Sequence, residues 1–472
     1  MVLDIKTQLD SAFNPKVVAV VGSRMVDDYI WLRNMSDLKC KLYSVQINPD
    51  DIAGIENLGI PNYKSLVEIP EPVDYVVVAV PRRAVPFVLK DAISKGVPSV
   101  HMFTSGFAES GNQEGFDIQQ QIATMVKDAG MLLIGPNCMG VFNPRVGMRF
   151  GAGQDVENIG TVSIISQSGG HASAMTTGLQ SCGIGVNMTV SFGNALMLDS
   201  PDLLEYFTQD TNTDIICAYI EGPKDGGEFF RILRKVAPSK PVVLWKGGRT
   251  EAGQRSAASH TGSLAGSMEV WNAGVKQAGA ISVDSLEELI DVVRCLTYLG
   301  KTKGDRIGII GGSGGQSVSM SDDFSSYGFT VPQLSDKTLE RMGSFFQLIG
   351  ASYFNPVDIG GINRDNLGEI LDLLTSDPNI EILAMMRGIQ ARRRSHEDLV
   401  DELKLYRQAK DNSGKPLLAM FWSSAPNNDS EAIKETDAIL QELGIPSFPT
   451  PLRAAVALRK VVDYYKILDD LE

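Results

Sequence analysis

Residues 161–170 read T-V-S-I-I-S-Q-S-G-G, a mostly apolar run that ends in a turn of serines and glycines. The run has the length of a buried strand, and the small residues of 171–175 that follow are typical of a helix start. A near-continuous apolar strand, a glycine-rich turn and a helix form the repeating unit of parallel α/β sheets. The rest of the chain repeats this pattern, which predicts an α/β fold.

Further apolar runs of this kind are separated by helical spacers. They cover 17–21, 42–45, 75–80, 99–103 and 131–134, then 186–190, 215–220 and 241–245, and finally 305–310, 382–386 and 416–421. Because 472 residues exceed what one core usually holds, these runs predict three α/β domains with parallel sheets, at 1–145, 146–300 and 301–472. The polar stretch 143–160 is predicted to be a linker.

Composition excludes several classes of protein. Apolar residues make up 43% of the chain and charged residues 21%, as in an ordinary globular protein. The five cysteines form no C-x-x-C pair, which argues against disulfides or a zinc site and for a reducing cytoplasm. The net charge of −14 disfavours nucleic-acid binding, and no apolar stretch reaches the length of a membrane span. The sequence predicts a cytoplasmic protein.

One long polar segment contains a histidine. Residues 246–266 read K-G-G-R-T-E-A-G-Q-R-S-A-A-S-H-T-G-S-L-A-G and follow the apolar run 241–245. Glycine, alanine and serine dominate this segment, which cannot build a core but can lie close to a ligand. It is predicted to be a loop after a strand, with room for His260 to move.

The chemistry open to His260 can be narrowed. No G-x-S-x-G motif occurs with the partners that a catalytic triad needs, and the segment offers no companion ligands for a metal. Acid–base catalysis, a covalent role of the imidazole and a purely structural histidine all stay open. No metal site is predicted.

A phosphorylated histidine would need an orienting carboxylate and dipoles that hold phosphate. Glu221 directly follows the run 215–220, which predicts a position at the carboxyl edge of the same sheet. The turn after 161–165 could hold phosphate through its backbone amides and the helix start; its residues are Ser166, Gln167, Ser168, Gly169 and Gly170. A surface carboxylate and an ordinary strand-to-helix turn remain the alternatives.

The first turn of the chain tests for a dinucleotide site. Residues 22–25, G-S-R-M, have one glycine where G-x-G-x-x-G needs three, and no acidic residue stands at the ribose-binding spacing. An oxidoreductase is therefore disfavoured. The turn still follows a predicted strand, where α/β sheets bind ligands, so another ADP-containing ligand remains open.

The last third of the chain contains two glycine-rich turns, G-G-S-G-G at 311–315 and N-P-V-D-I-G-G at 355–361. The charged segment from Arg387 to Lys410 is predicted to be the solvated face of a helix, with His396 on the surface.

Three motifs together resemble a known family. Y-I-E-G-P-K-D-G at 219–226, S-Q-S-G-G at 166–170 and G-R-T-E-A-G-Q-R-S-A-A-S-H-T-G-S-L-A-G at 248–266 look like those of the α subunits of ADP-forming acetyl-CoA synthetases, in the succinyl-CoA synthetase superfamily. The resemblance covers the whole chain. It implies a Rossmann-like CoA-binding domain, a flavodoxin-like domain with a phosphohistidine, and a third flavodoxin-like ligase-CoA domain.

The resemblance implies the reaction acyl-CoA + ADP + phosphate ⇌ carboxylic acid + CoA + ATP, through an acyl phosphate and a phosphohistidine. By motif, His260 would carry the phosphoryl group, Glu221 would stabilise it, and the 166–170 turn would face phosphate or acid. The resemblance also implies CoA contacts from the turns of the first domain: Gly22, Ser23, Arg24, Asn48, Pro49, Val80, Pro81, Ser105, Gly106, Phe107, Glu109, Asn137 and Cys138.

A partner is implied as well. The sequence shows no ATP-grasp domain, and 311–315 lacks the G-K-[ST] of a P-loop, so ADP or ATP with Mg²⁺ is expected on an ATP-grasp β subunit in an α2β2 assembly. The alternative is a non-catalytic subunit that binds CoA or acyl-CoA and regulates a partner. The first turn reads G-S-R-M-V-D-D-Y-I at 22–30, where the family usually has a glycine-bearing start to the helix. His171 after the 166–170 turn also departs from the family pattern.

Overall fold

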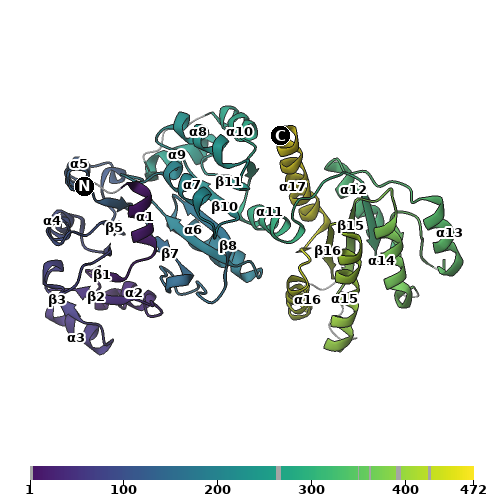
Figure 1. The fold of residues 1–472 in the computed structure, drawn as a ribbon, viewed down its shortest axis with the longest axis horizontal. Helices are drawn as coiled ribbons and strands as arrows, with labels where there is room; N and C mark the ends of the chain where they lie inside the picture. Colours follow the sequence, from purple (N-terminus) through teal and green to yellow (C-terminus); the bar gives the residue numbers. More distant parts are fainter. Residues whose placement is uncertain are drawn as a thin grey trace. The chain divides into compact units, whose positions relative to one another are not determined.

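The computed structural model describes residues 4–261, 267–348, 350–360, 363–389, 395–423 and 427–471, with only the backbone described at 257–261, 364 and 471. The chain divides into two compact units, Met1–Leu286 and Glu287–Glu472. The first runs from purple to teal in Figure 1 and the second from green to yellow. The described residues contain three sheets of six, six and five strands, which confirms the predicted α/β class.

The first sheet of unit 1 is entirely parallel. Its strands, in spatial order, are β3 (Asn62–Tyr63), β2 (Lys41–Val45), β1 (Val17–Val21), β4 (Tyr75–Val78), β5 (Ser99–Met102) and β6 (Leu132–Ile134). The helices of this part are α1 (Ile5–Phe13), α2 (Ile30–Asn34), α3 (Pro49–Asn57), α4 (Val85–Lys95) and α5 (Gln113–Ala129), with the 3-10 turns η1 (Met25–Asp27), η2 (Leu66–Glu68), η3 (Arg82–Ala84) and η4 (Ala108–Ser110).

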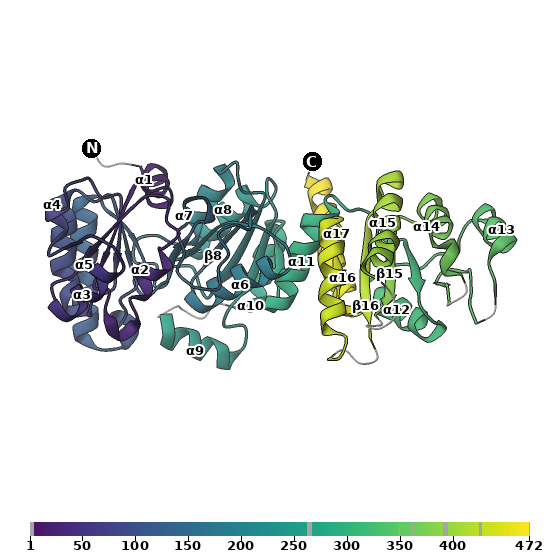
Figure 2. The ribbon, with the colours of Figure 1, turned by 90° about the horizontal axis from the view of Figure 1, so that it is seen from below.

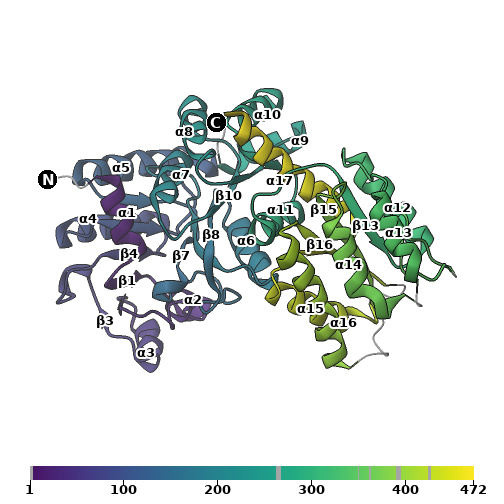
Figure 3. The same cartoon turned by 45° about the vertical axis from the view of Figure 1, so that its right-hand side comes forward.

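The second sheet of unit 1 is parallel except for one edge strand, β7, which pairs antiparallel with β9. Its order is β12 (Ile281–Val283), β11 (Val242–Lys246), β10 (Ile215–Ile220), β8 (Ile159–Ser166), β9 (Val186–Ser191) and β7 (Gly140–Phe142). Helix α6 (Gly169–Ser181) packs on β8 and β9, and it lies beside β8 in Figure 3. The other elements are η5 (Pro144–Val146), α7 (Ser200–Gln209), α8 (Gly226–Val236), α9 (Glu251–Thr261) and α10 (Met268–Gln277).

The sheet of unit 2 is parallel in all its pairs. Its order is β14 (Val357–Asp358), β13 (Ile307–Gly311), β15 (Ile382–Gly388), β16 (Leu417–Trp422) and β17 (Ser447–Phe448). The helices are α11 (Leu286–Leu299), α12 (Gly314–Ser326), α13 (Asp336–Phe345), α14 (Leu367–Ser376), α15 (His396–Ser413), α16 (Ser430–Glu442) and α17 (Pro451–Leu471), with the 3-10 turn η6 (Arg364–Asn366).

Burial explains why these runs form strands. Every residue of β1, β4, β9 and β10 is buried, as expected for strands covered by helices on both faces. The valine-rich composition of β1 and β4 suits the pleated surface, where branched side chains pack well. Among the described residues, no helix combines the length and the apolar character needed to cross a bilayer.

The structure corrects the predicted loop around His260. Residues 251–261 form helix α9, shown as a separate helix in Figure 2, and only 262–266 of that segment lie outside the described residues. The hydroxyl oxygen of Thr250 accepts a hydrogen bond from the Gly253 N–H at 3.1 Å, as a helix N-cap does. Small residues were taken as loop formers, but alanine is the strongest helix former.

Two further predictions were wrong. The stretch 143–160 is not a free linker, because Asn143, Met148 and Phe150 in it are each at most 1% exposed. Arg387 does not lie on a solvated helix: it belongs to β15, is 9% exposed and forms an ion pair with Glu402 on α15. A buried arginine needs such a partner. The high charge of the segment predicted exposure and gave no sign of this ion pair. His396 is exposed, as predicted.

We expect His101 on β5 to make the first unit sensitive to acid. Its ring is 1% exposed, Nε2 donates to the Cys138 carbonyl at 3.0 Å, and burial lowers its pKa to about 4. The unfolded chain takes up this proton near pH 6.5, so between these two values the unfolded state binds more protons and stability falls with falling pH. The loss from pH 7 to pH 5 should be about 2 kcal/mol.

His101→Asn should reduce this acid-induced loss, measured as the drop in the unfolding temperature between pH 7 and pH 5. The matched control is His396→Asn, which removes an exposed imidazole on α15 and should keep the wild-type drop. Equal drops in both variants and the wild type would contradict the prediction.

Candidate functional site

Glu221 lies in a turn that the phosphate-turn residue Gln167 holds in place. The Gln167 side-chain oxygen accepts hydrogen bonds from the N–H groups of Glu221 at 2.5 Å and Gly222 at 3.0 Å. Its amide nitrogen donates to the Gly222 carbonyl at 3.0 Å, and the residue is 6% exposed. One side chain therefore satisfies three backbone groups and joins the carboxyl ends of β8 and β10.

Lys246, the last residue of β11, supports the same turn. Its ammonium group donates to the Glu221 carbonyl at 2.5 Å and to the Gly247 carbonyl, and it lies 5.4 Å from the centre of the Trp271 ring. Burial lowers the pKa of Lys246, and the negative charge of Glu221 opposes that shift. The lysine thus ties the turn after β10 to the turn after β11.

The Glu221 carboxylate has one oxygen free for a donor. The Tyr219 side chain hydrogen-bonds the carboxylate, and the pKa of Tyr219 rises to about 12, chiefly through burial. The other oxygen, Oε2, is buried and has no hydrogen-bond partner within the part of the chain that the structure describes. A Cβ at Gly247 would lie 2.5 Å from the Tyr219 hydroxyl, so glycine keeps this space open. A ring N–H is a suitable donor for this oxygen.

The turn from Ser166 to Gly170 has the geometry of an anion site. The Ser166 hydroxyl donates to the Ser168 carbonyl at 2.7 Å and accepts from the Ser168 N–H at 3.1 Å, which closes the turn. Ser168 is the N-cap of α6, and its hydroxyl accepts from the His171 N–H at 3.3 Å. The first turn of α6 therefore presents its amides and the positive end of its dipole at this edge.

His171 packs against the rings of the sheet beside this turn. Its ring centre lies 4.3 Å from that of Tyr219 and 4.4 Å from that of Trp245. Burial lowers the pKa of His171, and the charge of Glu221 opposes the shift. The residue that departs from the family pattern is thus an aromatic neighbour of the phosphate turn.

His260 is the penultimate residue of α9, and its side chain lies outside the described residues. The helix contacts η4, the turn that contains Glu109. The backbone that carries the histidine therefore reaches the predicted CoA turns of the first sheet.

The first predicted CoA turn follows β1. Gly22 adopts φ 93°, and a Cβ there would lie 2.6 Å from the Val80 side chain and 2.8 Å from the Ala79 carbonyl oxygen, so only glycine fits. Ser23 is 1% exposed, and its hydroxyl oxygen lacks a partner among the described residues. An orphaned hydroxyl at the carboxyl end of a central strand suits a bound ligand.

The turn after β2 contains two more of the predicted CoA contacts, Asn48 and Pro49. Asn48 caps α3 with Pro49 at its first position, and the Asn48 amide donates to Asp51 at 2.8 Å. Asp51 also accepts from the Met25 N–H at 2.8 Å, which joins the turns after β1 and β2. Arg24 is half-exposed and pairs with Asp27 at 3.2 Å.

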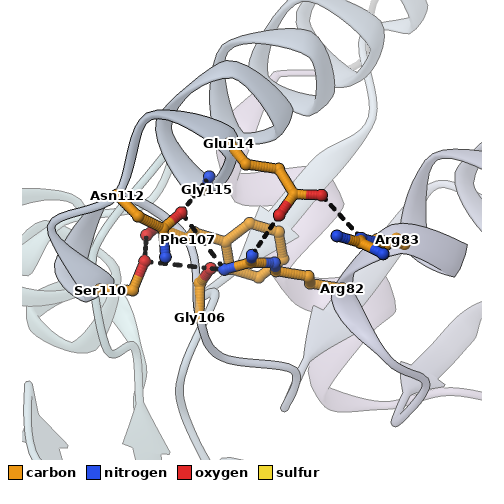
Figure 4. A network of polar contacts seen from close by, with 8 residues as sticks. All are labelled: Arg82, Arg83, Gly106, Phe107, Ser110, Asn112, Glu114 and Gly115. Atoms are coloured by element: carbon orange, nitrogen blue, oxygen red, sulfur yellow. Dashed lines mark hydrogen bonds and ion pairs between the residues drawn. The ribbon is translucent and has the colours of Figure 1, made fainter.

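The turn after β5 is held by a network drawn in Figure 4. Arg82, the residue after Pro81 on η3, donates to the Gly106 carbonyl at 2.5 Å and pairs with Glu114 at 2.6 Å. Arg83 also pairs with Glu114 at 2.6 Å. Phe107 is fully buried beneath this turn, whereas Ser105 is exposed. Arg82 and Arg83 follow the predicted strand 75–80, but neither was predicted to have a role in the site.

The turn after β6 contains Asn137 and Cys138. Asn137 adopts a left-handed φ of 58°, and its amide donates to Asn194 at 3.3 Å. The Cys138 thiol is 3% exposed and donates to the Met102 carbonyl at 3.7 Å, and burial raises its pKa to about 12. The thiol is therefore protonated and buried, and it cannot act as a nucleophile at neutral pH.

These contacts join the phosphate turn to the last CoA turn. A Cβ at Gly169 would lie 2.5 Å from Met139, the residue after Cys138. No described hydrogen bond links Arg24 or Asn48 to the Glu221 turn. Neither Asn194 nor Lys246 was predicted to be a site residue. Each nevertheless follows a predicted strand, at the edge where the fold places ligand sites.

The chain is similar to known proteins along most of its length. A family model described as "CoA binding domain" matches residues 16–144, and one described as "Succinyl-CoA ligase like flavodoxin domain" matches 159–296. The α subunit of acetate–CoA ligase (ADP-forming) II of Pyrococcus furiosus is 33% identical over 97% of this chain and 98% of its own length. Acetate–CoA ligase (ADP-forming) I of Archaeoglobus fulgidus is 31% identical, and the chain spans 64% of that protein.

A solved structure of a related synthetase is also similar to this chain over nearly its full length. The dinucleotide-forming acetyl-coenzyme A synthetase 1 of Ca. Korarchaeum cryptofilum, in complex with phosphate and ADP, matches with a TM-score of 0.83 and 29% identity. The match covers 98% of this chain and 97% of that one.

Gln167→Ala should loosen the Glu221 turn, because three backbone groups lose their partner. Hydrogen exchange followed by mass spectrometry should be at least about 10-fold faster in peptides that cover 219–224. The matched control is Gln154→Ala, since Gln154 is 2% exposed and accepts from the N–H groups of Phe150 and Gly151, both at 3.0 Å. The control should speed exchange around 150–154 only; unchanged exchange at 219–224 in Gln167→Ala would contradict the prediction.

Proposed function

The chain belongs to the α-subunit family of ADP-forming acetate–CoA ligases, within the succinyl-CoA ligase superfamily, and we propose that it performs the acyl-transfer half of their reaction. With a nucleotide-binding partner, it would interconvert acyl-CoA, ADP and phosphate with a carboxylic acid, CoA and ATP. The family makes it an acid–thiol ligase.

The proposed reaction has three transfers. A phosphate oxygen attacks the thioester carbonyl, the carbon–sulfur bond breaks, and CoA leaves as the thiolate while an acyl phosphate forms. A ring nitrogen of His260 then attacks phosphorus, the bond to the acyl oxygen breaks, and the carboxylate leaves. The phosphoryl group finally passes from His260 to ADP on the partner, where a bound Mg²⁺ would supply neutralisation of the developing charge.

The observation that carries this proposal is the buried, unpartnered Oε2 of Glu221 beside the phosphate turn. A buried acceptor without a donor costs about 1–3 kcal/mol, so a residue of this kind suggests a ligand or a moving side chain. A histidine ring that donates one N–H to Glu221 presents the lone pair of its other nitrogen to phosphorus. The turn Ser166–Gly170 would hold the phosphate oxygens through its amides.

CoA is proposed to bind at the carboxyl edge of the first sheet. The Ser23 hydroxyl is an orphaned polar atom there, and Gly22 allows the close approach of a ligand to the backbone. The 16–144 match to a CoA-binding domain supports the same location.

The partner is proposed to be an ATP-grasp β subunit, in an α2β2 assembly, with ADP or ATP and Mg²⁺ bound there. One observation supports a separate nucleotide chain: the Pyrococcus relative, which this chain matches over 98% of its length, is itself a subunit α.

Incubation with acetyl-CoA and radiolabelled phosphate, or with ATP, Mg²⁺ and the partner subunit, should label His260 with an acid-labile, base-stable phosphoryl group. Peptide mass spectrometry locates the label. His260→Ala should lose the label and at least about 1,000-fold of turnover, because the covalent intermediate cannot form. Normal turnover in this variant would disprove the mechanism. CoA binding with no label from either source would favour a regulatory CoA-binding subunit.

Glu221→Gln should slow labelling of His260 about 10- to 100-fold, because the amide no longer stabilises the charged ring. CoA affinity, measured by calorimetry, should stay unchanged. Glu228→Gln is the matched control, since Glu228 is half-exposed and pairs with Arg231 on α8. Its labelling rate should stay within about 2-fold of the wild type. Equal loss of labelling and CoA binding in Glu221→Gln would make Glu221 a structural residue.

A further inference from the structure

Two turns of unit 1, 135–139 after β6 and 191–196 after β9, are joined along their backbones. The Asn194 N–H donates to the Pro136 carbonyl at 3.0 Å, and the Leu196 N–H donates to the Gly135 carbonyl at 2.9 Å. A Cβ at Gly193 would lie 2.3 Å from the Pro136 carbonyl oxygen, so the two chains approach as closely as glycine allows. The last CoA turn is thus joined to the second sheet.

Left-handed backbone conformations concentrate at this junction. Asn137, Gly193 and Ala195 have φ values of 58°, 54° and 54°. Such conformations are unfavourable for residues other than glycine, and they persist where surrounding contacts impose them. Asparagine tolerates this region better than most residues, whereas alanine has no such advantage. The junction is therefore a rigid support for the side chain that it presents, Asn194.

Both ends of the Asn194 amide hold residues of the first sheet's turns. Its nitrogen donates to Glu109 Oε2 at 2.7 Å, and its oxygen accepts from the Asn137 amide at 3.3 Å. Glu109 Oε1 in turn accepts from the Gly106 N–H at 2.7 Å. Among the described residues, the Gly106 N–H is thus the donor to Glu109 Oε1. The donor to Oε2 is the amide of Asn194, in the turn after β9.

Glu109 is placed between the CoA turn and the histidine helix. Its carboxylate holds the N–H of Gly106, while Arg82 holds the carbonyl of the same residue at 2.5 Å. Glu109 is also the middle residue of η4, which α9 contacts. Rotation of this carboxylate would therefore disturb the turn 105–107, whereas the contact of α9 with η4 is made along the η4 backbone and does not depend on the carboxylate.

We propose that Asn194 is a positioning residue: through Glu109 it fixes the CoA turn 105–107 relative to the phosphate turn, so that thioester and phosphate meet. The inference rests on the proposed function. Asn194 acts on the step that uses acyl-CoA and has no part in the transfer between ATP and His260. That second transfer needs only the histidine, Glu221 and the phosphate turn.

Asn194→Ala should slow the labelling of His260 from acetyl-CoA and radiolabelled phosphate about 10- to 100-fold and raise the KM for CoA. Labelling from ATP, Mg²⁺ and the partner subunit should stay within about 2-fold of the wild type. The matched control is Asn187→Ala on β9, the strand that precedes the Asn194 turn, because the Asn187 amide also donates hydrogen bonds, to Ser163 and Asp210. The control should leave both labelling rates unchanged.

A hydrogen-bond swap separates positioning from general stability. Asn194→Asp alone places a carboxylate against that of Glu109 and should slow acetyl-CoA labelling at least as much as Asn194→Ala. Adding Glu109→Gln restores every contact: the new amide accepts from Gly106 and donates to the new carboxylate, which still accepts from Asn137. The double variant should be labelled at least about 5-fold faster than Asn194→Asp alone.

The outcomes are distinguishable. No label in the wild type from either source would disprove the proposed function itself. A labelled wild type with equal acetyl-CoA labelling in Asn194→Ala would overturn only this inference. Loss of labelling from both sources in Asn194→Ala, or a double variant no faster than Asn194→Asp, would also overturn it.

Discussion

The side chain of Gln167 joins two strand ends, and the arrangement of the candidate site depends on that link. A glutamine can do this because it carries an acceptor and a donor at the same tip, so it satisfies two N–H groups and one carbonyl of the Glu221 turn. Buried in the sheet edge, it brings the phosphate turn and the orienting carboxylate into one structure. Lys246 extends the link to the strand that precedes the histidine helix.

Side chains hold several turns at the carboxyl edges of the two sheets of unit 1. In the first sheet, Arg82 and Glu109 hold the two backbone groups of Gly106, and Asn194 holds Glu109 from the second sheet. Such networks resist reorganisation, because each buried partner would be left unsatisfied if one contact opened. A preorganised edge of this kind is what a site that handles phosphate and a thioester needs, since charge develops there during the reaction.

The proposed chemistry also requires that the element carrying His260 moves. That element is a helix and not the predicted loop. The histidine was expected on a glycine-rich loop, but its backbone continues an alanine-rich helix capped by Thr250. A helix that ends near the histidine and contacts η4 can carry the ring as part of a rigid element.

Local pattern was sufficient to determine the α/β class, the strand ends and the candidates Glu221 and Ser166–Gly170, because apolar runs and glycine-rich turns are set by neighbouring residues. Local pattern did not predict helix α9, because the helix propensity of alanine was overlooked. It also did not predict the burial of Arg387, because the ion-pair partner Glu402 lies on another element. Only the tertiary structure identified Gln167 as a link, Lys246 as a support and Asn194 as the partner of Glu109. These roles depend on hydrogen bonds between residues 25 to 85 positions apart, and no local pattern records which strand ends become neighbours.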